Sequence, residues 1–253
     1  MTKIITLANQ KGGVGKTTLA QAIGNAKRIE GHKVLFIDLD QQSNLTWSLD
    51  GNALNANANI FEVIVNQANI SDAIVETAQG DLIQSNSKLM GIDAELQSIS
   101  AGREYRLTEA IKSIKGGYDY IIIDTPPQSS QLVINALTAS DYLIVPAEAS
   151  IFSIQAISQI DDVIHLVKRY TNPQLDFIGI VLNLFNDRTV LSKEIQDMTT
   201  DIASRLDTKV FQSTIRKSVV IDEAHANKKS IFDYAPNSKV ASDLNALIKE
   251  LNI

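Results

Sequence analysis

A glycine-rich stretch over residues 9–18 constrains the fold of this chain more than any other feature. It reads Asn-Gln-Lys-Gly-Gly-Val-Gly-Lys-Thr-Thr, follows the apolar run 4–8 and precedes a helix-compatible run over 19–29. Glycines let the backbone turn tightly and bring several N–H groups toward one point, and the first turn of a following helix adds unpaired N–H groups. A strand, a glycine-rich turn and a helix in this order predict a phosphate-binding loop.

The loop predicts a role for each of its residues. Lys16 supplies a cation for the β- and γ-phosphates, and Thr17 supplies a hydroxyl for Mg²⁺. Gln10 stands where the general pattern has glycine, and Lys11 is a lysine that the general pattern does not require. A chance glycine-rich turn is the alternative, but the loop and both flanking runs agree with each other. The residues expected to contact the nucleotide are Gly12, Gly13, Val14, Gly15, Lys16, Thr17 and Thr18.

Apolar runs alternate with helix-compatible stretches along the rest of the chain. The runs 33–37, 81–84, 118–123, 142–145, 177–182 and 209–211 predict strands. The stretches 45–49, 61–67, 71–77, 103–114, 131–139, 151–170, 191–206, 219–227 and 238–251 predict helices. This alternation predicts an α/β fold with a doubly wound, mostly parallel sheet and helices on both faces. No linker or repeat interrupts it, and the chain opens at the first strand. We therefore expect a single domain over 1–253 without an N-terminal DNA-binding extension.

Polar side chains fall at the carboxyl ends of the predicted strands, where ligands bind in sheets of this kind. Asp124 follows the apolar run 121–123, which is the form of a carboxylate that holds Mg²⁺ through water. The alternative for Asp124 is an exposed aspartate at a strand end. The other polar residues at predicted strand ends are Asn9, Asp38, Asp40, Glu148 and Asn183.

Charge and composition exclude several classes of protein. The 253 residues carry 23 Lys and Arg against 29 Asp and Glu, a net charge of −6, which excludes a globally basic nucleic-acid binder. The absence of cysteine excludes thiol nucleophiles and cysteine-ligated iron–sulfur clusters, and is typical of a cytoplasmic protein. No apolar run approaches the length of a transmembrane helix. Residues 201–253 hold 8 Lys and Arg against 7 Asp and Glu, so either a local basic patch or ordinary charge scatter fits that segment.

The loop over 11–18 resembles the deviant Walker A loop of the ParA/MinD ATPases, and the resemblance to ParA-type partition ATPases covers nearly the whole chain. Beyond the loop it includes residues 118–127, 134–139, 187–189 and 218–224. The resemblance implies an ATPase that uses ATP and Mg²⁺. The resemblance also implies that Lys11 reaches across a dimer interface to the partner's nucleotide, and that Asp40 positions the attacking water. Asp38 is implied as a supporting carboxylate beside the metal residues Thr17 and Asp124.

The chain departs from the family pattern at two places. Gln41 replaces the proline that usually follows the second aspartate, and residues 215–217 read Ile-Arg-Lys where the family usually has Ile-Pro-Arg. No Asn-Lys-x-Asp guanine signature follows the late strands, so adenine is the expected base. Asn183 is a candidate adenine contact, with a strand-end turn residue as the alternative.

The resemblance implies a function in partitioning DNA or positioning cargo. ATP would join two monomers into a homodimer, the dimer would bind DNA without sequence preference, and a ParB-like or cargo adaptor would stimulate hydrolysis. A cytoplasmic, nucleoid-associated location follows, and the cargo is open between a plasmid, a chromosome and a protein assembly. The residues expected to contact DNA are Lys193, Arg216, Lys217, Lys228 and Lys229, with Arg188 near them; an ordinary solvated surface is the alternative.

Two other functions fit parts of the sequence. A membrane-cycling MinD-like regulator would need a basic amphipathic tail, whereas residues 238–251 predict a helix docked on the core. A small-molecule kinase or amide ligase would need an acceptor pocket and commonly a cluster of further Lys or Arg residues, which the sequence does not show.

Overall fold

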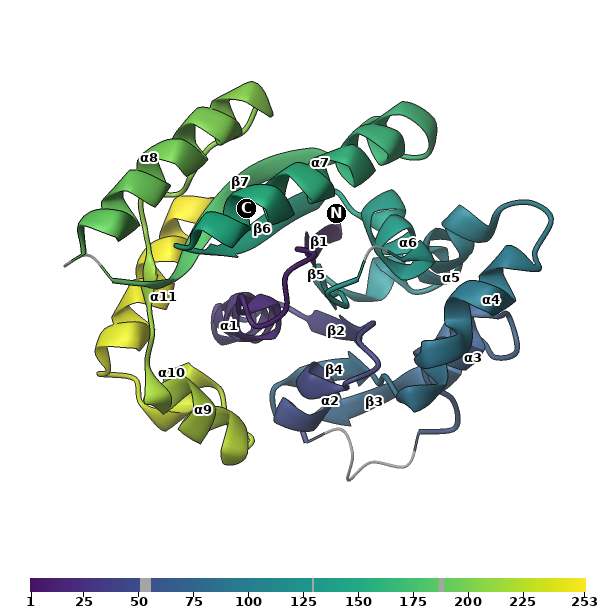
Figure 1. The fold of residues 1–253 in the computed structure, drawn as a ribbon. Helices are drawn as coiled ribbons and strands as arrows, with labels where there is room; N and C mark the ends of the chain where they lie inside the picture. The colour runs from purple at the N-terminus through teal and green to yellow at the C-terminus, as the bar shows by residue number, and fades with distance from the viewer. Residues whose placement is uncertain (51–55, 129, 187–188) are drawn as a thin grey trace.

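Eight strands form one sheet in the computed structural model, which describes residues 1–50, 56–128, 130–186 and 189–253 (Figure 1). The sheet order is β3-β4-β2-β5-β1-β6-β7-β8. Every pairing is parallel except that of β3 with β4. The strands are β1 (Lys3–Leu7), β2 (Val34–Asp38), β3 (Ile74–Thr77), β4 (Gly80–Ile83), β5 (Tyr120–Asp124), β6 (Tyr142–Glu148), β7 (Asp176–Phe185) and β8 (Ile215–Arg216).

Helices cover both faces of this sheet. One face carries α1, α9, α10 and α11, and the opposite face carries α3 to α8, as Figure 1 shows. This arrangement confirms the predicted doubly wound α/β fold. The helices are α1 (Lys16–Ile29), α2 (Asn44–Ser48), α3 (Ile60–Ile64), α4 (Ile92–Gln97), α5 (Arg106–Lys112), α6 (Gln131–Ala139), α7 (Ile151–Tyr170), α8 (Val190–Arg205), α9 (Val219–Ala226), α10 (Ile231–Tyr234) and α11 (Lys239–Leu251).

The central strands β2 and β5 are apolar up to the aspartates that end them, because each face of the sheet is buried. In β5, Ile122 packs into the cluster beneath α1, whereas Ile121 and Ile123 pack into the cluster beneath α3 to α6. Successive side chains of a strand point to opposite faces, so a continuous apolar run supplies both clusters. The same alternation in β2 sends Phe36 to the α1 side.

A close approach of α1 to β2 fixes the position of that helix. Gly24 of α1 lies against the ring of Phe36, and a Cβ at residue 24 would lie 2.3 Å from the ring. Only a residue without a side chain allows this approach. Since α1 follows the glycine-rich loop directly, its packing also fixes where that loop lies at the end of β1.

The sequence predicted a helix over 71–77, but residues 74–77 form a strand, so that prediction was wrong for most of its length. One short helical turn, Ile70–Ala73, is followed at once by β3, which pairs antiparallel with β4. The β-branched side chains of β3 suit a pleated strand. The hairpin between the two strands closes at Gly80, whose φ of 126° favours glycine.

Residues 209–211 do not extend into a strand as predicted. Val210 makes one isolated bridge, to Ile180, and the ladder at this edge continues only at β8. Phe211 is instead turned into the core, where its ring covers Gly179. The sequence also gave no sign of β8, α4 or α10, which are too short to show a periodic pattern.

Candidate nucleotide-binding site

The loop between β1 and α1 leaves the N-terminus of α1 ready for an anion. Gly13 and Gly15 have φ angles of 74° and 90°, in the left-handed region that glycine adopts without strain. The helix begins at Lys16 with no side-chain cap and no acidic residue in its first turn. Its first N–H groups and the positive end of its dipole are therefore available to a phosphate.

Two buried asparagines tie this loop to neighbouring strands. Asn9 donates to the carbonyl of Pro146 in β6 at 2.7 Å, and Asn183 in β7 donates to the carbonyl of Val14 at 2.7 Å. Asn183 also covers Gly15, where an added Cβ would lie 1.9 Å from the amide nitrogen. In this structure Asn183 therefore anchors the loop, and its contact with adenine stays a prediction.

Asp124 and Thr17 present oxygen atoms at the end of β5. The Thr17 hydroxyl donates to Asp124 Oδ2 at 2.6 Å, while Oδ1 is buried without a hydrogen-bond partner. Burial, and next the neighbouring Asp38 carboxylate, raise the pKa of Asp124 to about 8. A carboxylate with an unsatisfied oxygen beside a hydroxyl fits Mg²⁺, which prefers oxygen ligands. The described residues contain no group of three or more His, Cys, Asp or Glu that could enclose a metal, so phosphate and water oxygens would complete its shell.

Asp38 lies beside Asp124 because the two residues are in register in neighbouring strands. Its carboxylate accepts hydrogen bonds from the backbone N–H of Asp40 at 3.0 Å and from the N–H and hydroxyl of Thr46, both at 2.8 Å. Burial raises the pKa of Asp38 to about 6, although these hydrogen bonds oppose the shift. Asp38 thus holds α2 against the end of β2, and its role beside the metal stays a prediction.

Asp40 starts the turn that leads from β2 to α2. Its Oδ1 accepts the Gln42 N–H at 2.9 Å, and its carbonyl accepts the Ser43 N–H at 2.8 Å. The Ser85 hydroxyl also donates to that carbonyl. These bonds close the turn although Gln41 replaces the usual proline. The Asp40 carboxylate lines a pocket that opens over the phosphate loop, so this departure from the family pattern does not move it away from the site.

Lys16 is a buried residue that also lines this pocket. Its Nζ makes a long contact of 3.5 Å with the carbonyl of Lys11. Burial lowers the pKa of Lys16, while the Asp124 and Asp40 carboxylates oppose that shift. A buried ammonium group with weak partners is well placed to pair with a phosphate.

Lys11 makes contacts that the sequence did not predict. Its Nζ forms an ion pair with Glu148 at 2.5 Å and donates to the Ser150 hydroxyl at 2.9 Å. Glu148 ends β6, and Ser150 precedes α7. Lys11 is therefore held by residues of its own chain in this structure.

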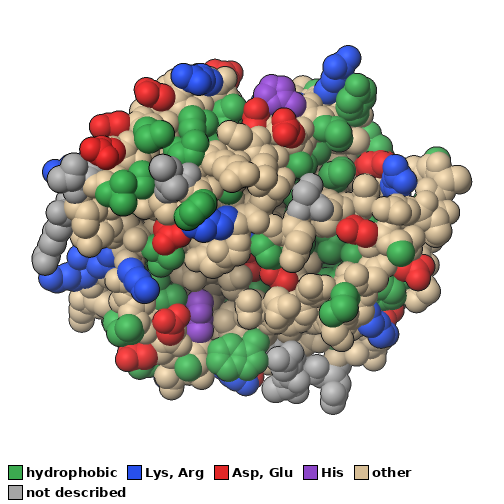
Figure 2. All heavy atoms as spheres, viewed as in Figure 1, with side chains coloured by type: hydrophobic (Ala, Val, Ile, Leu, Met, Phe, Trp, Pro, Cys, Tyr) green, Lys and Arg blue, Asp and Glu red, His purple; other side chains and the backbone are tan. Residues whose placement is uncertain are grey.

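A pocket of about 610 Å³ opens over the loop. Figure 2 shows this face of the molecule, which is hollowed near its centre beside a histidine side chain. Asp40 and all the predicted loop residues except the buried Val14 line the pocket. Trp47 of α2 lines one wall, and Asp222 and His225 of α9 line the other. Burial lowers the pKa of His225, with Asp222 opposing the shift. The α9 wall comes from a segment more than 200 residues from the loop. The resemblance includes residues 218–224, but nothing in the sequence placed that segment at the pocket.

The predicted DNA-contacting residues differ in their surroundings. Arg216 makes a bidentate ion pair with Asp243 of α11, at 2.6 and 2.8 Å, and Lys228 pairs with Asp50. The structure brings Lys228 and Lys229 together on the turn between α9 and α10. Lys193, Lys217 and Lys229 are exposed. Arg188 lies outside the described residues.

The fold and the site together define a phosphate-loop nucleoside-triphosphate hydrolase. A family model described as "AAA domain" matches residues 2–177. The sporulation initiation inhibitor protein Soj of Bacillus subtilis is 34% identical over 99% of this chain and 98% of its own length. The chromosome partitioning protein ParA of Caulobacter vibrioides is 34% identical over 92% of this chain and 87% of its own length.

A solved structure has the same fold. It is named cobyrinic acid a,c-diamide synthase from Mycobacterium smegmatis, with bound ATP analog and magnesium. It is 32% identical to this chain, with a TM-score of 0.79 over 95% of this chain and 98% of that one. The chain belongs to the ParA-type family of ATPases, and it is an ATP hydrolase.

Proposed function

We propose that this protein is a ParA-like ATPase that partitions DNA or positions another cargo. ATP and Mg²⁺ are its cofactors, and ATP joins two subunits face to face. The ATP-bound homodimer binds DNA without sequence preference, and a ParB-like or cargo adaptor stimulates the hydrolysis that releases it. The protein then works in the cytoplasm on the nucleoid.

One observation carries this proposal. The chain presents an uncapped α1 N-terminus with a buried Lys16 and an additional lysine, Lys11, beside the same loop. Two relatives that match nearly its whole length are named sporulation initiation inhibitor protein Soj and chromosome partitioning protein ParA. The second lysine supports a shared site, because the family resemblance implies that it contacts a nucleotide on a facing subunit. Its ion pair with Glu148 would then have to break.

The chain's own residues divide the reaction between them. The loop N–H groups and Lys16 bind the phosphates, and Thr17 and Asp124 hold Mg²⁺, which neutralises phosphate charge. Asp40, on the pocket wall, orients the attacking water. Asp38 keeps that wall in place through its bonds to the Asp40 N–H and to Thr46.

The test is a pair of measurements on the purified protein. The protein should release phosphate from Mg²⁺–ATP without any small-molecule acceptor. A non-hydrolysable ATP analogue should double the mass of the protein measured by light scattering. Lys16→Ala should lose both phosphate release and dimer formation, because it removes the buried cation beside the phosphates. A wild-type protein that stays monomeric with the analogue would contradict the shared-site proposal.

Amide synthesis is a second candidate, because the solved structure with 32% identity carries the name of a diamide synthase. Among the residues that line the pocket, however, Lys16 is the one Lys or Arg, and it belongs to the loop. Phosphate release that required a carboxylate substrate and an amide-nitrogen donor would favour this candidate over partition.

Membrane cycling has no support in the structure. α11 buries six apolar residues against the sheet, so its apolar face is already covered. No helix in the described ranges is long and apolar enough to cross a bilayer. Co-sedimentation with anionic liposomes in the presence of ATP would contradict this assignment.

A further inference from the structure

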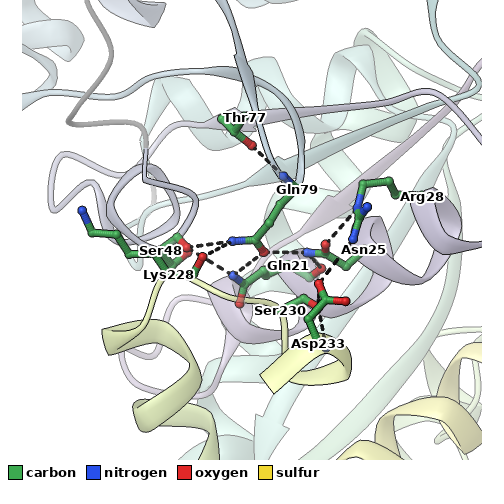
Figure 3. A network of polar contacts seen from close by, with 9 residues as sticks. All are labelled: Gln21, Asn25, Arg28, Ser48, Thr77, Gln79, Lys228, Ser230 and Asp233. Atoms are coloured by element: carbon green, nitrogen blue, oxygen red, sulfur yellow. Dashed lines mark hydrogen bonds and ion pairs between the residues drawn. The ribbon is translucent and has the colours of Figure 1, made fainter. Parts of the chain in front are cut away.

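Gln79 lies at the centre of a buried polar network that joins segments far apart in the sequence (Figure 3). It sits in the turn between β3 and β4. Its Oε1 accepts hydrogen bonds from Gln21 and Asn25 of α1, both at 3.0 Å. Its Nε2 donates to the carbonyls of Ser48 at 3.1 Å and Lys228 at 3.0 Å. All four hydrogen-bonding positions of the amide are used.

The two carbonyls that Gln79 bonds belong to segments that lead into opposite walls of the nucleotide pocket. Ser48 is the last residue of α2 and itself lines the pocket. Lys228 lies just after α9, whose Asp222 and His225 line the facing wall. The Gln79 side chain, outside the pocket, therefore bridges the end of α2 and the turn that follows α9.

The α2 wall of the pocket is connected to the carboxylates of Asp38 and Asp40. Asp38 accepts two hydrogen bonds from Thr46 in the middle of α2, and the turn before α2 starts at Asp40. On its other side the network reaches α1, the helix that begins at Lys16. Any shift of these elements on nucleotide binding changes the positions of the groups that Gln79 bonds.

After α9 the chain enters a basic turn at the surface, which contains Lys228 and Lys229. Lys228 has a φ of 53°, so the chain reverses there, and the Lys229 N–H bonds back to the Ala224 carbonyl at 3.0 Å. Figure 3 shows the Lys228 side chain pointing away from Gln79 while its carbonyl faces the amide. The side chain forms an ion pair with Asp50, just beyond α2. The directions of both lysines thus depend on a backbone turn that Gln79 holds.

We propose that Gln79 is a positioning residue that couples the nucleotide site to the Lys228–Lys229 turn. A movement of α2 changes the hydrogen bonds of the Gln79 amide and thereby moves the Lys228–Lys229 turn. The position of the turn decides whether its two lysines can contact a polyanion. This inference rests on the proposed function for the identity of the polyanion, which is duplex DNA, but the coupling itself is independent of DNA.

Gln79→Met tests the coupling, since methionine has a similar length and cannot make the four hydrogen bonds. Hydrogen–deuterium exchange over residues 224–230 should change in the wild type on adding a non-hydrolysable ATP analogue, and the change should be lost in the variant. In the same samples, the ratio of affinities for a random-sequence duplex with and without the analogue should fall at least about fivefold, the lower end of typical allosteric couplings. ATP affinity and the dimer seen by light scattering should be kept.

Two control variants separate coupling from loss of stability. Ile83→Val truncates a buried side chain of β4 without touching the network, and it should keep both the exchange response and the affinity ratio. Asp50→Asn removes only the surface ion pair, so it should keep the response and raise the nucleotide-free affinity for DNA. A Gln79→Met protein that responds to the analogue as the wild type does would overturn the inference, as would loss of the response in Ile83→Val.

The result for DNA alone bears on the proposed function rather than on Gln79. If wild-type protein binds no duplex with the analogue, the proposed function fails. The exchange response over 224–230 would then still confirm or overturn the coupling.

Discussion

We expect Asp40 to be the residue at which nucleotide binding and hydrolysis can be separated. It lines the pocket but forms no hydrogen bond to the described phosphate loop. In the turn that it starts, an alanine would lose the Oδ1 bond to the Gln42 N–H but keep the main-chain bond from the Ser43 N–H. Asp40→Ala should therefore bind ATP and dimerise while its turnover falls by about 10²–10⁴, the usual cost of losing one such group. Calorimetry for ATP and phosphate release for turnover would measure the two effects.

Near-normal turnover in Asp40→Ala would move the water-positioning role elsewhere, with Asp38 the first candidate. Asp38→Ala is not an equivalent test, because it also removes the partners of Thr46 and so loosens α2. The comparison is informative only when thermal unfolding of both variants is measured alongside turnover.

Asp124 makes the stability of the nucleotide-free protein depend on pH. Its pKa is about 8 in the folded protein against 3.8 for an ordinary aspartate, because burial favours the neutral form. Between these two values the folded state binds more protons at this site than the unfolded state does. The free energy of unfolding therefore falls as pH rises through this window.

Asp124→Asn is the matched control, since asparagine keeps the shape of the protonated carboxyl and does not titrate. In chemical denaturation from pH 5 to pH 9 without nucleotide, the wild type should lose stability relative to this variant as pH rises. A difference between the two proteins that is constant with pH, or that changes in the opposite direction, would contradict the assigned protonation.

At the scale of elements, the phosphate loop and β7 are packed as one unit. Gly15 has a left-handed backbone conformation and lies under Asn183. Gly15→Ala should cost about 1–2 kcal/mol for the left-handed conformation, and further free energy for the collision with the Asn183 amide. Asn183→Ala removes two hydrogen bonds, one to the Val14 carbonyl and one from the Leu184 N–H, and should cost about 0.5–1.5 kcal/mol for each.

A double-mutant cycle measures this contact. Because Asn183→Ala removes the atoms that an alanine at 15 would strike, the double variant should be less destabilised than the sum of the two single variants. Thermal unfolding of the four proteins gives the coupling. Additive losses would show that Asn183 does not restrict residue 15.

The elements that the sequence predicted well are those with long buried patterns. β5 and β2 are continuous apolar runs closed by an aspartate, and the loop and α1 follow directly from glycine spacing. Residues 74–77 were misassigned because Ser71 and Asp72 resemble a helix start, whereas pairing with β4 decides the conformation of the residues that follow. The α9 wall of the pocket and the Lys11–Glu148 pair depend on contacts between distant segments, which no local pattern records.

At the scale of the whole molecule, a protein with net charge −6 needs a concentrated basic surface to bind DNA. Ion pairs within the subunit already engage two of the predicted contacts, Arg216 with Asp243 and Lys228 with Asp50. The other predicted contacts, Lys193, Lys217 and Lys229, are exposed. If DNA is the partner, as we propose, one subunit offers few phosphate contacts, and we expect tight binding to require two subunits acting together.

The dependence of DNA affinity on salt concentration tests this account most directly. Each phosphate contact contributes about 0.9 to the slope of log affinity against log salt, so about three contacts give a slope near −3 and an ATP dimer about twice that. We predict that a non-hydrolysable ATP analogue doubles the slope for the wild type, and that Lys11→Ala with the analogue keeps the single-subunit slope. The same slope with and without the analogue in the wild type would contradict an ATP-gated dimer as the form that binds DNA.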